Sequence, residues 1–399
     1  MKPTTIAEVL ETCMERAVER NEVAGCSLMV LKNFEEKVYL ETGYADLEKG
    51  RKITRESVFR MYSMSKPVTA AAVMRLVEDG YLDLYDFVGS YFDSFREQEY
   101  EGPDGTLQRV PEDRAMRIRD LLNMTSGLTY PEPNTKAGTG TGKLMDSGIR
   151  RLGTQNQMST QEFCGRVGRC PLLFIPGSSW NYSVSADILG GVIEKITGMT
   201  FGDYLRESIF DPCEMEDTGF FVPQEKRDRL VTAYENADRK EGVALLPYLG
   251  NHLCIRNDGG ENAFESGGAG LFSTIDDYRK FTQMLLNNGT ALNGKRILRP
   301  GTVRYMTEGR LLEHQQRSFS QWIGLEGHTY GCLNRVLAEP EQAGLIGRRG
   351  EYGWDGWLGT YYLNDPQEKE TIILMLNKRD YGQNRLTRQL RNIIGSVRA

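Results

Sequence analysis

The segment Phe59–Pro67 contains two side chains whose types and spacing could carry out nucleophilic chemistry. Apolar residues recur at helical spacing after Pro67 and stop at Gly80, so the segment predicts a short strand, a turn and then a helix. Pro67 lacks an N–H and must lie in the first helical turn, which puts Ser63 and Lys66 on one face of the helix start. A hydroxyl at the positive end of a helix dipole, with an amine beside it, is a candidate activated nucleophile.

The same pair also fits a serine that caps the helix beside a solvated lysine. Ser65 is a second serine in this segment, but no lysine follows it at the same spacing. A serine nucleophile also needs a base, an oxyanion hole and an orienting group. The remaining parts of such a site must therefore come from elsewhere in the chain.

The base is not expected to be a histidine. His252, His314 and His328 lie in no recognisable triad context, and the sequence Gly-x-Ser-x-Gly is absent, which excludes an α/β-hydrolase site. The three histidines are expected to be structural or at the surface. Tyr182 lies just before a helix predicted to begin near Ser185, and cationic neighbours could lower its pKa enough for it to act as a base. An ordinary half-buried aromatic side chain is the alternative.

The elements that must position these residues mix helices and strands at both ends of the chain. Residues 4–21 predict an amphipathic helix with a capping box, and residues 25–32 and 37–44 predict a hairpin. Sequential hairpins predict an antiparallel sheet with the terminal helices on one face. In the C-terminal part, helices are predicted over residues 275–287, 296–309 and 384–396, and strands over 345–352, 357–363 and 371–376, with turns at 353–356 and 364–369.

The middle of the chain, from about residue 81 to 245, is predicted to be mostly helical. Residues 130–158 are polar and rich in glycine, and predict a long loop of the kind that forms lids or stays disordered. Within them, Gly138–Leu144 is similar to a phosphate loop, but the spacing is one residue short, Leu144 replaces the magnesium ligand and no strand precedes it. A nucleotide site is therefore excluded. The helical windows are Ile118–Met124, Thr160–Arg169, Ser185–Thr197 and Phe201–Ile209.

Composition narrows the function classes further. The 399 residues are 39% hydrophobic and 26% charged, which is typical of a soluble globular protein. The net charge of −6 and the lack of a basic run argue against nucleic-acid binding. No signal peptide or membrane span is read, so a cytoplasmic protein is expected. The seven cysteines are scattered, which predicts buried free thiols and neither a disulfide framework nor a zinc site.

Six motifs that occur in order along the chain resemble those of the serine β-lactamase and penicillin-binding protein superfamily. The resemblance is greatest to its class C-like branch of esterases, transesterases and D-aminopeptidases, and covers residues from about 20 to 390. It implies an α+β fold, a β-lactamase/transpeptidase-like α/β/α sandwich on an antiparallel sheet with an inserted, mostly helical lobe. Residues 1–85 and 245–399 would form the α/β lobe, residues 86–244 the helical lobe, and the site would lie between them. The motifs are Ser63-Met-Ser-Lys66, Arg119–Leu128, Pro176–Ser183, Gly268–Thr274, Gly353–Gly356 and Gly359–Tyr361.

The resemblance also implies roles for individual residues. Ser63 corresponds to the acylated nucleophile and Lys66 to its proton partner. Tyr182 corresponds to the tyrosine that serves as base in acylation and as acid toward the leaving group. The backbone N–H groups of Ser63 and Trp357 would form the oxyanion hole. The third motif would be formed by Trp354, Asp355 and Gly356 on the innermost strand. These three residues would also bind the substrate.

Two positions depart from the β-lactamase pattern. Val184 stands where β-lactamases carry the asparagine that binds a β-lactam side chain, and it is counted with the substrate-binding residues. Asp355 lies in the third motif, where a cation usually holds a substrate carboxylate, and would repel that carboxylate. Penicillins and D-Ala-D-Ala ends are therefore disfavoured, and Trp354 is similar to the esterase branch. Asp355 could attract a substrate amine, or pair with an arginine such as Arg348 or Arg349 in a purely structural contact, and both alternatives stay open.

These observations favour a serine acyl hydrolase that forms an acyl-enzyme on Ser63. The expected enzyme is carboxylesterase-like, with or without acyl transfer, and acts on small uncharged acyl esters. No metal, organic cofactor, nucleic acid or membrane is expected as a partner. A D-amino-acid peptidase, amidase or penicillin-binding protein with weak β-lactamase activity is one alternative, and a non-catalytic binding or sensor module with the same fold is the other.

Overall fold

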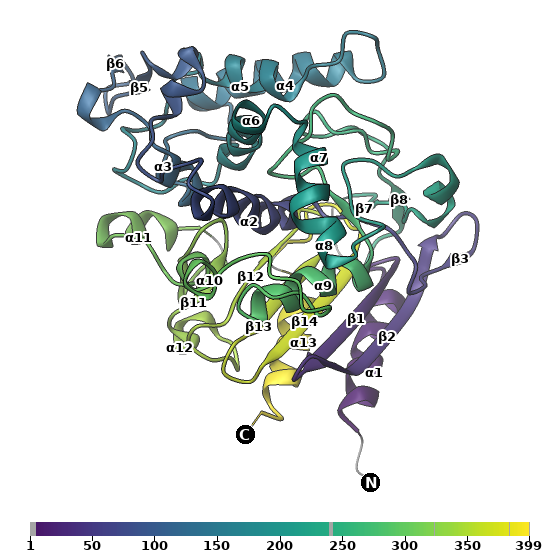
Figure 1. The fold of residues 1–399 in the computed structure, drawn as a ribbon. Helices are drawn as coiled ribbons and strands as arrows, with labels where there is room; N and C mark the ends of the chain where they lie inside the picture. The colour runs from purple at the N-terminus through teal and green to yellow at the C-terminus, as the bar shows by residue number, and fades with distance from the viewer. Residues whose placement is uncertain (1–4, 239–241, 323, 383, 399) are drawn as a thin grey trace.

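The computed structural model describes residues 5–238, 242–322, 324–382 and 384–398. Among these residues, eight strands form one antiparallel sheet in the lower half of Figure 1, in the order β10-β11-β12-β13-β14-β1-β2-β3. The strands are β1 (Gly25–Lys32), β2 (Glu35–Asp46), β3 (Arg51–Lys52), β10 (His328–Tyr330), β11 (Arg335–Leu337), β12 (Tyr352–Asp355), β13 (Tyr361–Asp365) and β14 (Glu370–Leu376).

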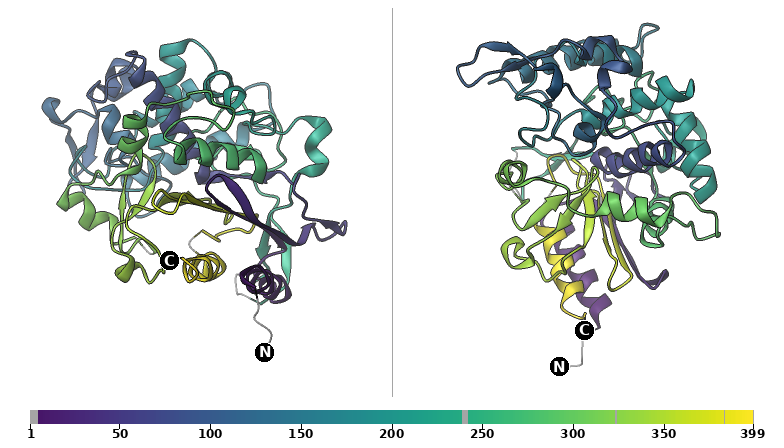
Figure 2. Two further views of the ribbon diagram at one scale, coloured as in Figure 1. Left: turned by 60° about the horizontal axis from the view of Figure 1, so that its bottom comes forward. Right: turned by 60° about the vertical axis from the view of Figure 1, so that its left-hand side comes forward.

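Both faces of the sheet are covered, and the central strand β14 shows how. Its side chains alternate, so that Leu374 packs toward one hydrophobic cluster and Ile373 and Met375 toward another. The first cluster lies under the terminal helices α1 (Ile6–Glu19) and α13 (Arg385–Gly395), which lie side by side in Figure 2. The predicted antiparallel sheet with both terminal helices on one face is confirmed.

The opposite face of the sheet is covered by α9 (Ile275–Leu286), α10 (Pro300–Thr307) and α2 (Ser65–Glu78). Nearly every residue of α2 is buried, whereas an amphipathic surface helix buries only one stripe. The reason is that α2 lies between the sheet and the helices of the upper half (Figure 1), and packs against both. Its N-terminal end is thereby fixed at the centre of the molecule.

The upper half of Figure 1 is mostly helical. Its segments run from the hairpin β5 (Glu99–Glu101) and β6 (Leu107–Arg109) to helix α7. The division of the chain at residues 85 and 245 stays a prediction. The helices are α3 (Ile118–Leu122), α4 (Lys136–Arg151), α5 (Thr160–Val167), α6 (Ser185–Thr197) and α7 (Phe201–Leu205).

Helix α4 occupies most of the segment that was predicted to be a loop over residues 130–158, so that prediction is wrong. Thr135 caps the helix by accepting a hydrogen bond from the Gly138 N–H at 2.9 Å. The glycines that suggested a loop instead allow close packing. A Cβ atom on Gly138 would lie 2.4 Å from the carbonyl oxygen of Glu132, and one on Gly148 would lie 2.4 Å from the Cys254 sulfur.

The C-terminal strands are also displaced from their predicted positions. A short helix, α12 (Pro340–Ala343), precedes the strand, and β12 runs through the Gly353–Gly356 segment that was predicted to be a turn. A Cβ atom on Gly353 would lie 2.0 Å from the backbone oxygen of Tyr362 on β13. This glycine therefore permits close pairing of two strands instead of a turn.

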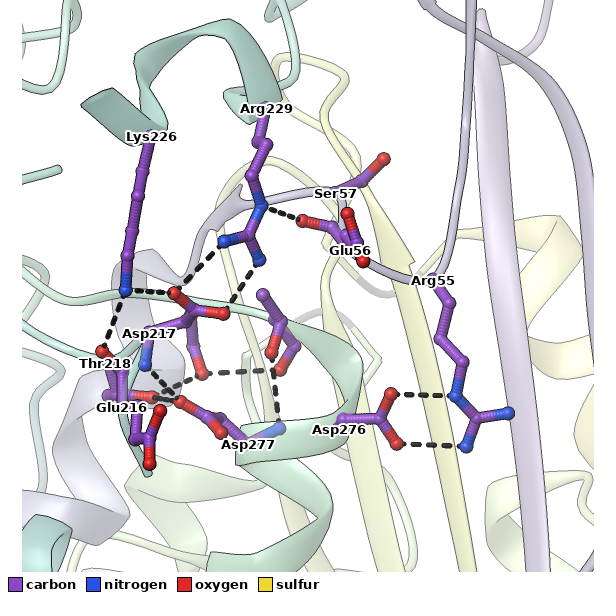
Figure 3. A network of polar contacts seen from close by, with 12 residues as sticks. Arg55, Glu56, Ser57, Glu216, Asp217, Thr218, Lys226, Arg229, Asp276 and Asp277 are labelled. Atoms are coloured by element: carbon purple, nitrogen blue, oxygen red, sulfur yellow. Dashed lines mark hydrogen bonds and ion pairs between the residues drawn. The ribbon is translucent and has the colours of Figure 1, made fainter. Parts of the chain in front are cut away.

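A polar network joins the segment 216–229 to the start of helix α9 (Figure 3). The Asp217 carboxylate accepts hydrogen bonds from Lys226 Nζ at 2.6 Å and Arg229 Nη2 at 2.7 Å. The Asp217 N–H donates to the Asp277 carboxylate at 2.6 Å. Burial alone would raise the pKa of Asp217, but the bonds from Arg229 and Lys226 hold it below its ordinary value.

Three further properties concern the described residues only. None of their helices is both long and apolar enough to cross a membrane. Within these ranges, no group of three or more histidine, cysteine or acidic side chains is arranged so that it could hold a metal ion. All seven cysteines are free thiols, and Cys13 and Cys170 are half-buried while the others are buried.

Candidate active site

Ser63 lies in a tight 3₁₀ turn, Tyr62–Met64, between strand β4 (Phe59–Arg60) and helix α2. Tyr62 has φ of 45°, a left-handed conformation that is strained for a bulky aromatic residue. Its buried ring lies 5.1 Å from the ring of Trp357, a contact that helps to hold this conformation. The bend leaves Ser63 half-buried at the edge of two cavities.

Lys66 is completely buried beside Ser63. Its Nζ donates to Ser63 Oγ at 3.1 Å, to the hydroxyl of Tyr130 at 3.0 Å and to the carbonyl oxygen of Gly268 at 2.8 Å. Burial lowers the pKa of Lys66 to about 7, although the negative charge of Asp187 opposes that shift. A substantial fraction of this amine is therefore neutral near neutral pH.

Asp187 is a buried carboxylate in the first turn of α6, and no role was predicted for it. Its Oδ1 accepts hydrogen bonds from Ser266 Oγ at 2.5 Å and from the Gly268 N–H at 3.0 Å. Gly268 in turn binds Lys66 through its carbonyl oxygen. Burial raises the pKa of Asp187, and the bond from Ser266 opposes this shift. The sequence feature that could have indicated a buried Asp187 was its position directly before the apolar residues Ile188 and Leu189.

Tyr182 lies on the other side of Lys66, with its ring 4.6 Å from Nζ. Its hydroxyl accepts a hydrogen bond from Trp354 Nε1 at 3.1 Å. Burial raises the pKa of Tyr182 well above its ordinary value, and hydrogen bonds with Ser63 and Trp354 offset only part of this rise. The prediction that cationic neighbours lower its pKa is therefore wrong. Tyr182 keeps its proton at neutral pH.

Tyr130 is a second group that sequence reasoning missed, because it was assigned to the start of a loop. Its hydroxyl binds Lys66, and its ring lies 5.5 Å from that of Tyr182. Burial raises the pKa of Tyr130, so it is also a neutral phenol. The sequence feature that could have indicated Tyr130 was its position two residues after the motif Arg119–Leu128.

Asp355 forms an ion pair with Arg335 on the neighbouring strand β11, with Nη1 and Oδ1 2.6 Å apart. Both groups are largely buried, and the side chain of Arg335 is only 5% exposed. Arg348 and Arg349 form ion pairs with other carboxylates, so the predicted pairing of Asp355 with either of them is wrong. The alternative of a structural arginine contact holds, with a different arginine.

Trp357 follows β12, and its backbone N–H and that of Ser63 donate to no other protein group in the described part of the chain. Gly356 separates Trp357 from the strand, and a Cβ atom there would lie 2.5 Å from the Met61 carbonyl oxygen. Gly356 and Val184 are buried, and neither is among the described residues that line a cavity at Ser63.

Two cavities open on Ser63 and share Tyr182 and Trp357. The tryptophan cavity, of about 240 Å³, is also lined by Trp180, Trp322, Leu325, Trp354, Asp355, Asp380 and Gly382. The second cavity, of about 400 Å³, is also lined by Tyr62, Tyr130, Pro131, Met145, Asp146, Ile149, His252 and Leu253.

The histidines do not take the place of Lys66. His252 stacks on Trp357 with ring centroids 4.0 Å apart, and burial lowers its pKa to about 4. His314 is exposed and His328 is buried in β10. The amine of Lys66, and no histidine of the described residues, forms a hydrogen bond with Ser63 Oγ.

Four of the six sequence motifs thus supply residues around the Ser63 hydroxyl, and the family model described as Beta-lactamase matches residues 10–394. The chain belongs to the beta-lactamase family. It is a serine hydrolase, as the sequence predicts. An uncharacterised member from Mycobacterium tuberculosis is 32% identical over 344 residues, covering 84% of this chain and 81% of that protein. Esterase EstB from Burkholderia gladioli is 26% identical over 391 residues, covering 94% of this chain and 91% of the esterase.

The family fold is confirmed by solved structures as well. The structure of EstCE1, described as a hydrolase with promiscuous acyltransferase activity, superposes with a TM-score of 0.80 at 23% identity. The superposition covers 98% of each chain. The β-lactamase/transpeptidase-like α+β fold predicted from the motifs is therefore the fold of this beta-lactamase family member.

Proposed function

We propose that this family member is a carboxylesterase-like enzyme that forms its acyl-enzyme on Ser63 and acts on small uncharged acyl esters. The observation that carries the proposal is the contact of Ser63 Oγ with the completely buried amine of Lys66, at 3.1 Å. Because burial lowers the pKa of Lys66 to about 7, the neutral amine is available to accept the hydroxyl proton. The similarity to an esterase over most of the chain supports the same conclusion.

Acylation begins when Ser63 Oγ forms a bond to the ester carbonyl carbon and its proton passes to Lys66 Nζ. The backbone N–H groups of Ser63 and Trp357 stabilise the charge that develops on the carbonyl oxygen. The bond to the alcohol oxygen then breaks, and that oxygen receives the proton of the Tyr182 hydroxyl. Tyr182 regains a proton from the Lys66 ammonium, so the alcohol leaves neutral and the acyl-enzyme remains.

Deacylation uses the same groups in the opposite direction. A water molecule attacks the acyl carbon and gives its proton to the Tyr182 and Lys66 pair. The bond between the acyl carbon and Ser63 Oγ breaks, and Oγ takes a proton back. The carboxylic acid is released and the starting state is restored. In this scheme Tyr182 acts as a neutral proton carrier, in agreement with its raised pKa.

The test is hydrolysis of p-nitrophenyl acetate and butyrate by the wild type, Ser63→Ala and Tyr182→Phe. We expect Ser63→Ala to lose at least about a thousandfold in kcat. Labelling with a fluorophosphonate and peptide mapping should place the label on Ser63 and not on Ser65, whose Oγ accepts a hydrogen bond from the Leu271 N–H at 3.0 Å. A single burst without turnover, or full activity of Ser63→Ala, would contradict the proposal and favour a binding module. Faster turnover of D-amino-acid amides than of esters would favour the peptidase alternative.

A further inference from the structure

All four tryptophans of the chain line the tryptophan cavity beside Ser63. Trp180 precedes α6, Trp322 follows helix α11 (Glu313–Phe319), and the other two lie in or just after β12. The fold therefore gathers them from separate parts of the sequence. An apolar wall could have been built from aliphatic side chains, so the concentration of indole rings requires its own explanation.

Most of the ring pairs in this cavity are inclined to one another, and Trp180 and Tyr182 are stacked, with an interplanar angle of 22° at 6.3 Å. Trp322 lies edge-on to Trp180, with an interplanar angle of 87° at 5.6 Å, and is tilted by 69° from Tyr182 at 5.8 Å. Trp354 is tilted by 36° from Tyr182 at 5.5 Å. Rings at such different angles form the walls of a rounded space. A compact, branched group fits this space better than a flat aromatic ring does.

The charges around the cavity favour a cation in that space. Asp355 and Asp380 line it, and no lysine, arginine or histidine is among its described lining residues. Arg335 pairs with Asp355, and Arg379 pairs with both Asp380 and Glu235. Each lining carboxylate thus has an arginine partner, so the attraction for a cation comes from the carboxylates and rings that face the cavity and not from a net charge. Aromatic faces and carboxylates together are the usual surroundings of a bound ammonium group.

Neither Arg335 nor Arg379 is among the described residues that line the cavity. Arg335 lies 5.3 Å from the Trp354 ring centroid, and Arg379 lies 5.8 Å from that of Trp357. Asp380 is 60% exposed and accepts a hydrogen bond from Trp357 Nε1 at 2.6 Å, which holds a carboxylate at the edge of the cavity.

The position of Tyr182 assigns the cavity to one half of an ester. The Tyr182 hydroxyl is bonded to Trp354, which lines the tryptophan cavity but is not among the described residues of the second cavity. In the proposed mechanism this hydroxyl protonates the departing alcohol. The alcohol half therefore faces the tryptophans, and the acyl half faces the apolar Met145 and Ile149 of the second cavity.

We propose that the tryptophan cavity binds the alcohol half of esters whose alcohol carries a compact cation of the quaternary ammonium type. This inference rests on the proposed esterase function and extends it, from uncharged esters to esters in which the acyl half is uncharged and the alcohol half carries a cation. It adds a class of substrate that the family resemblance does not supply. Neutral esters are still turned over, but without the attraction of the rings and carboxylates.

The kinetic test compares two acetates of the same shape. In acetylcholine the alcohol carries a trimethylammonium group, and in 3,3-dimethylbutyl acetate a carbon atom replaces the nitrogen. We expect kcat/KM for acetylcholine to be at least about tenfold higher. Equal values, or a preference for the neutral ester, would overturn the inference.

Two variants test the residues involved. Trp322→Leu removes a 39% exposed ring but keeps an apolar wall, and Asp380→Asn removes a charge at the rim. Both should bring the ratio of the two acetates toward one, chiefly by lowering the value for acetylcholine. Asp355→Asn is less suitable because it leaves the buried Arg335 without its partner. An unchanged ratio in both variants would contradict the assignment.

A binding measurement separates this inference from the proposed function. Because all four tryptophans line one cavity, intrinsic tryptophan fluorescence reports on it directly. Choline should change the fluorescence of Ser63→Ala at a concentration at least about tenfold lower than 3,3-dimethylbutan-1-ol does. If p-nitrophenyl acetate is not hydrolysed but choline binds in this way, the esterase proposal fails and the cation site stands. If the ester is hydrolysed and the two alcohols bind alike, only the cation site fails.

Discussion

The indole N–H of Trp354 donates a hydrogen bond to the hydroxyl of Tyr182 at 3.1 Å. The bond uses a lone pair of the phenol oxygen and leaves its proton directed elsewhere. Related penicillin-recognising enzymes have a cation in this motif, whereas here a neutral dipole contacts the tyrosine. The tyrosine is therefore oriented without an added positive charge that would attract a substrate carboxylate.

Trp354→Phe should keep the aromatic wall and lose the donor. We expect kcat for p-nitrophenyl butyrate to fall by about tenfold or more with little change in KM, because the bond acts on proton transfer. Tyr330→Phe is the matched control. Tyr330 packs against Trp354 at 5.4 Å, and its buried hydroxyl has no hydrogen-bond partner in the described part of the chain. A rise in KM alone for Trp354→Phe would assign it to substrate binding only.

Asp187→Asn should change the pH dependence of acylation. Lys66 must be neutral to accept a proton, so kcat/KM rises with pH through a pKa of about 7. The Asp187 charge raises that pKa, and its removal should move the rising limb to lower pH. The measurement is kcat/KM from about pH 5 to 9, with Asp203→Asn, an exposed first-turn aspartate of α7, as control. If the rising limb of the kcat/KM profile stays in place or moves to higher pH, the effect assigned to the Asp187 charge on Lys66 is contradicted.

Asp217→Asn should lower the free energy of unfolding near pH 7 by about 1–2 kcal/mol, because the three charge-assisted hydrogen bonds that its carboxylate accepts from Lys226 and Arg229 (Figure 3) are weakened. The folded-state pKa of Asp217 is lowered, so this stabilisation is complete above about pH 5 and is lost as the pH falls through and below about 4. Urea unfolding at several pH values measures it. The exposed Asp228 provides the control Asp228→Asn, and a pH-independent difference for Asp217→Asn would exclude the assigned ion pairs.

Two glycines of helix α4 should respond in opposite ways to alanine. Gly142→Ala places a methyl group 3.6 Å from Pro131, an ordinary contact, and should stabilise the protein by about 0.5–1 kcal/mol through helix propensity. Gly138→Ala forces a methyl group against the Glu132 backbone and should destabilise it by about 1–3 kcal/mol. Thermal and urea unfolding measure both changes. Equal effects at the two positions would indicate that this segment is not the helix described.

Periodicity and chain-order motifs predicted the sheet, the terminal helices and the grouping of Ser63, Lys66 and Tyr182. These features depend on local patterns that can be recognised in a single sequence. Helix α4 was missed because its glycines lower helix propensity. These glycines allow close contact with other segments, and such contacts exist only in the folded molecule.

The electrostatics of the site could not be read from the sequence. Lys66 and Tyr130 are 64 residues apart and Arg335 and Asp355 are 20 apart, and only the tertiary fold brings each pair together. The pKa prediction for Tyr182 failed because it considered charges and not burial, which is the largest cause of its shift. Burial depends on the whole chain, so a local motif does not specify it.

The two cavities that meet at Ser63 have a kinetic consequence. An acyl group held in the second cavity leaves the tryptophan cavity open once the first alcohol has departed. Water and a new alcohol then compete for the same intermediate, and their partition ratio should rise linearly with alcohol concentration until the cavity is saturated. The concentration of alcohol in the surrounding solution, and not a change in the protein, would then determine whether hydrolysis or transesterification prevails.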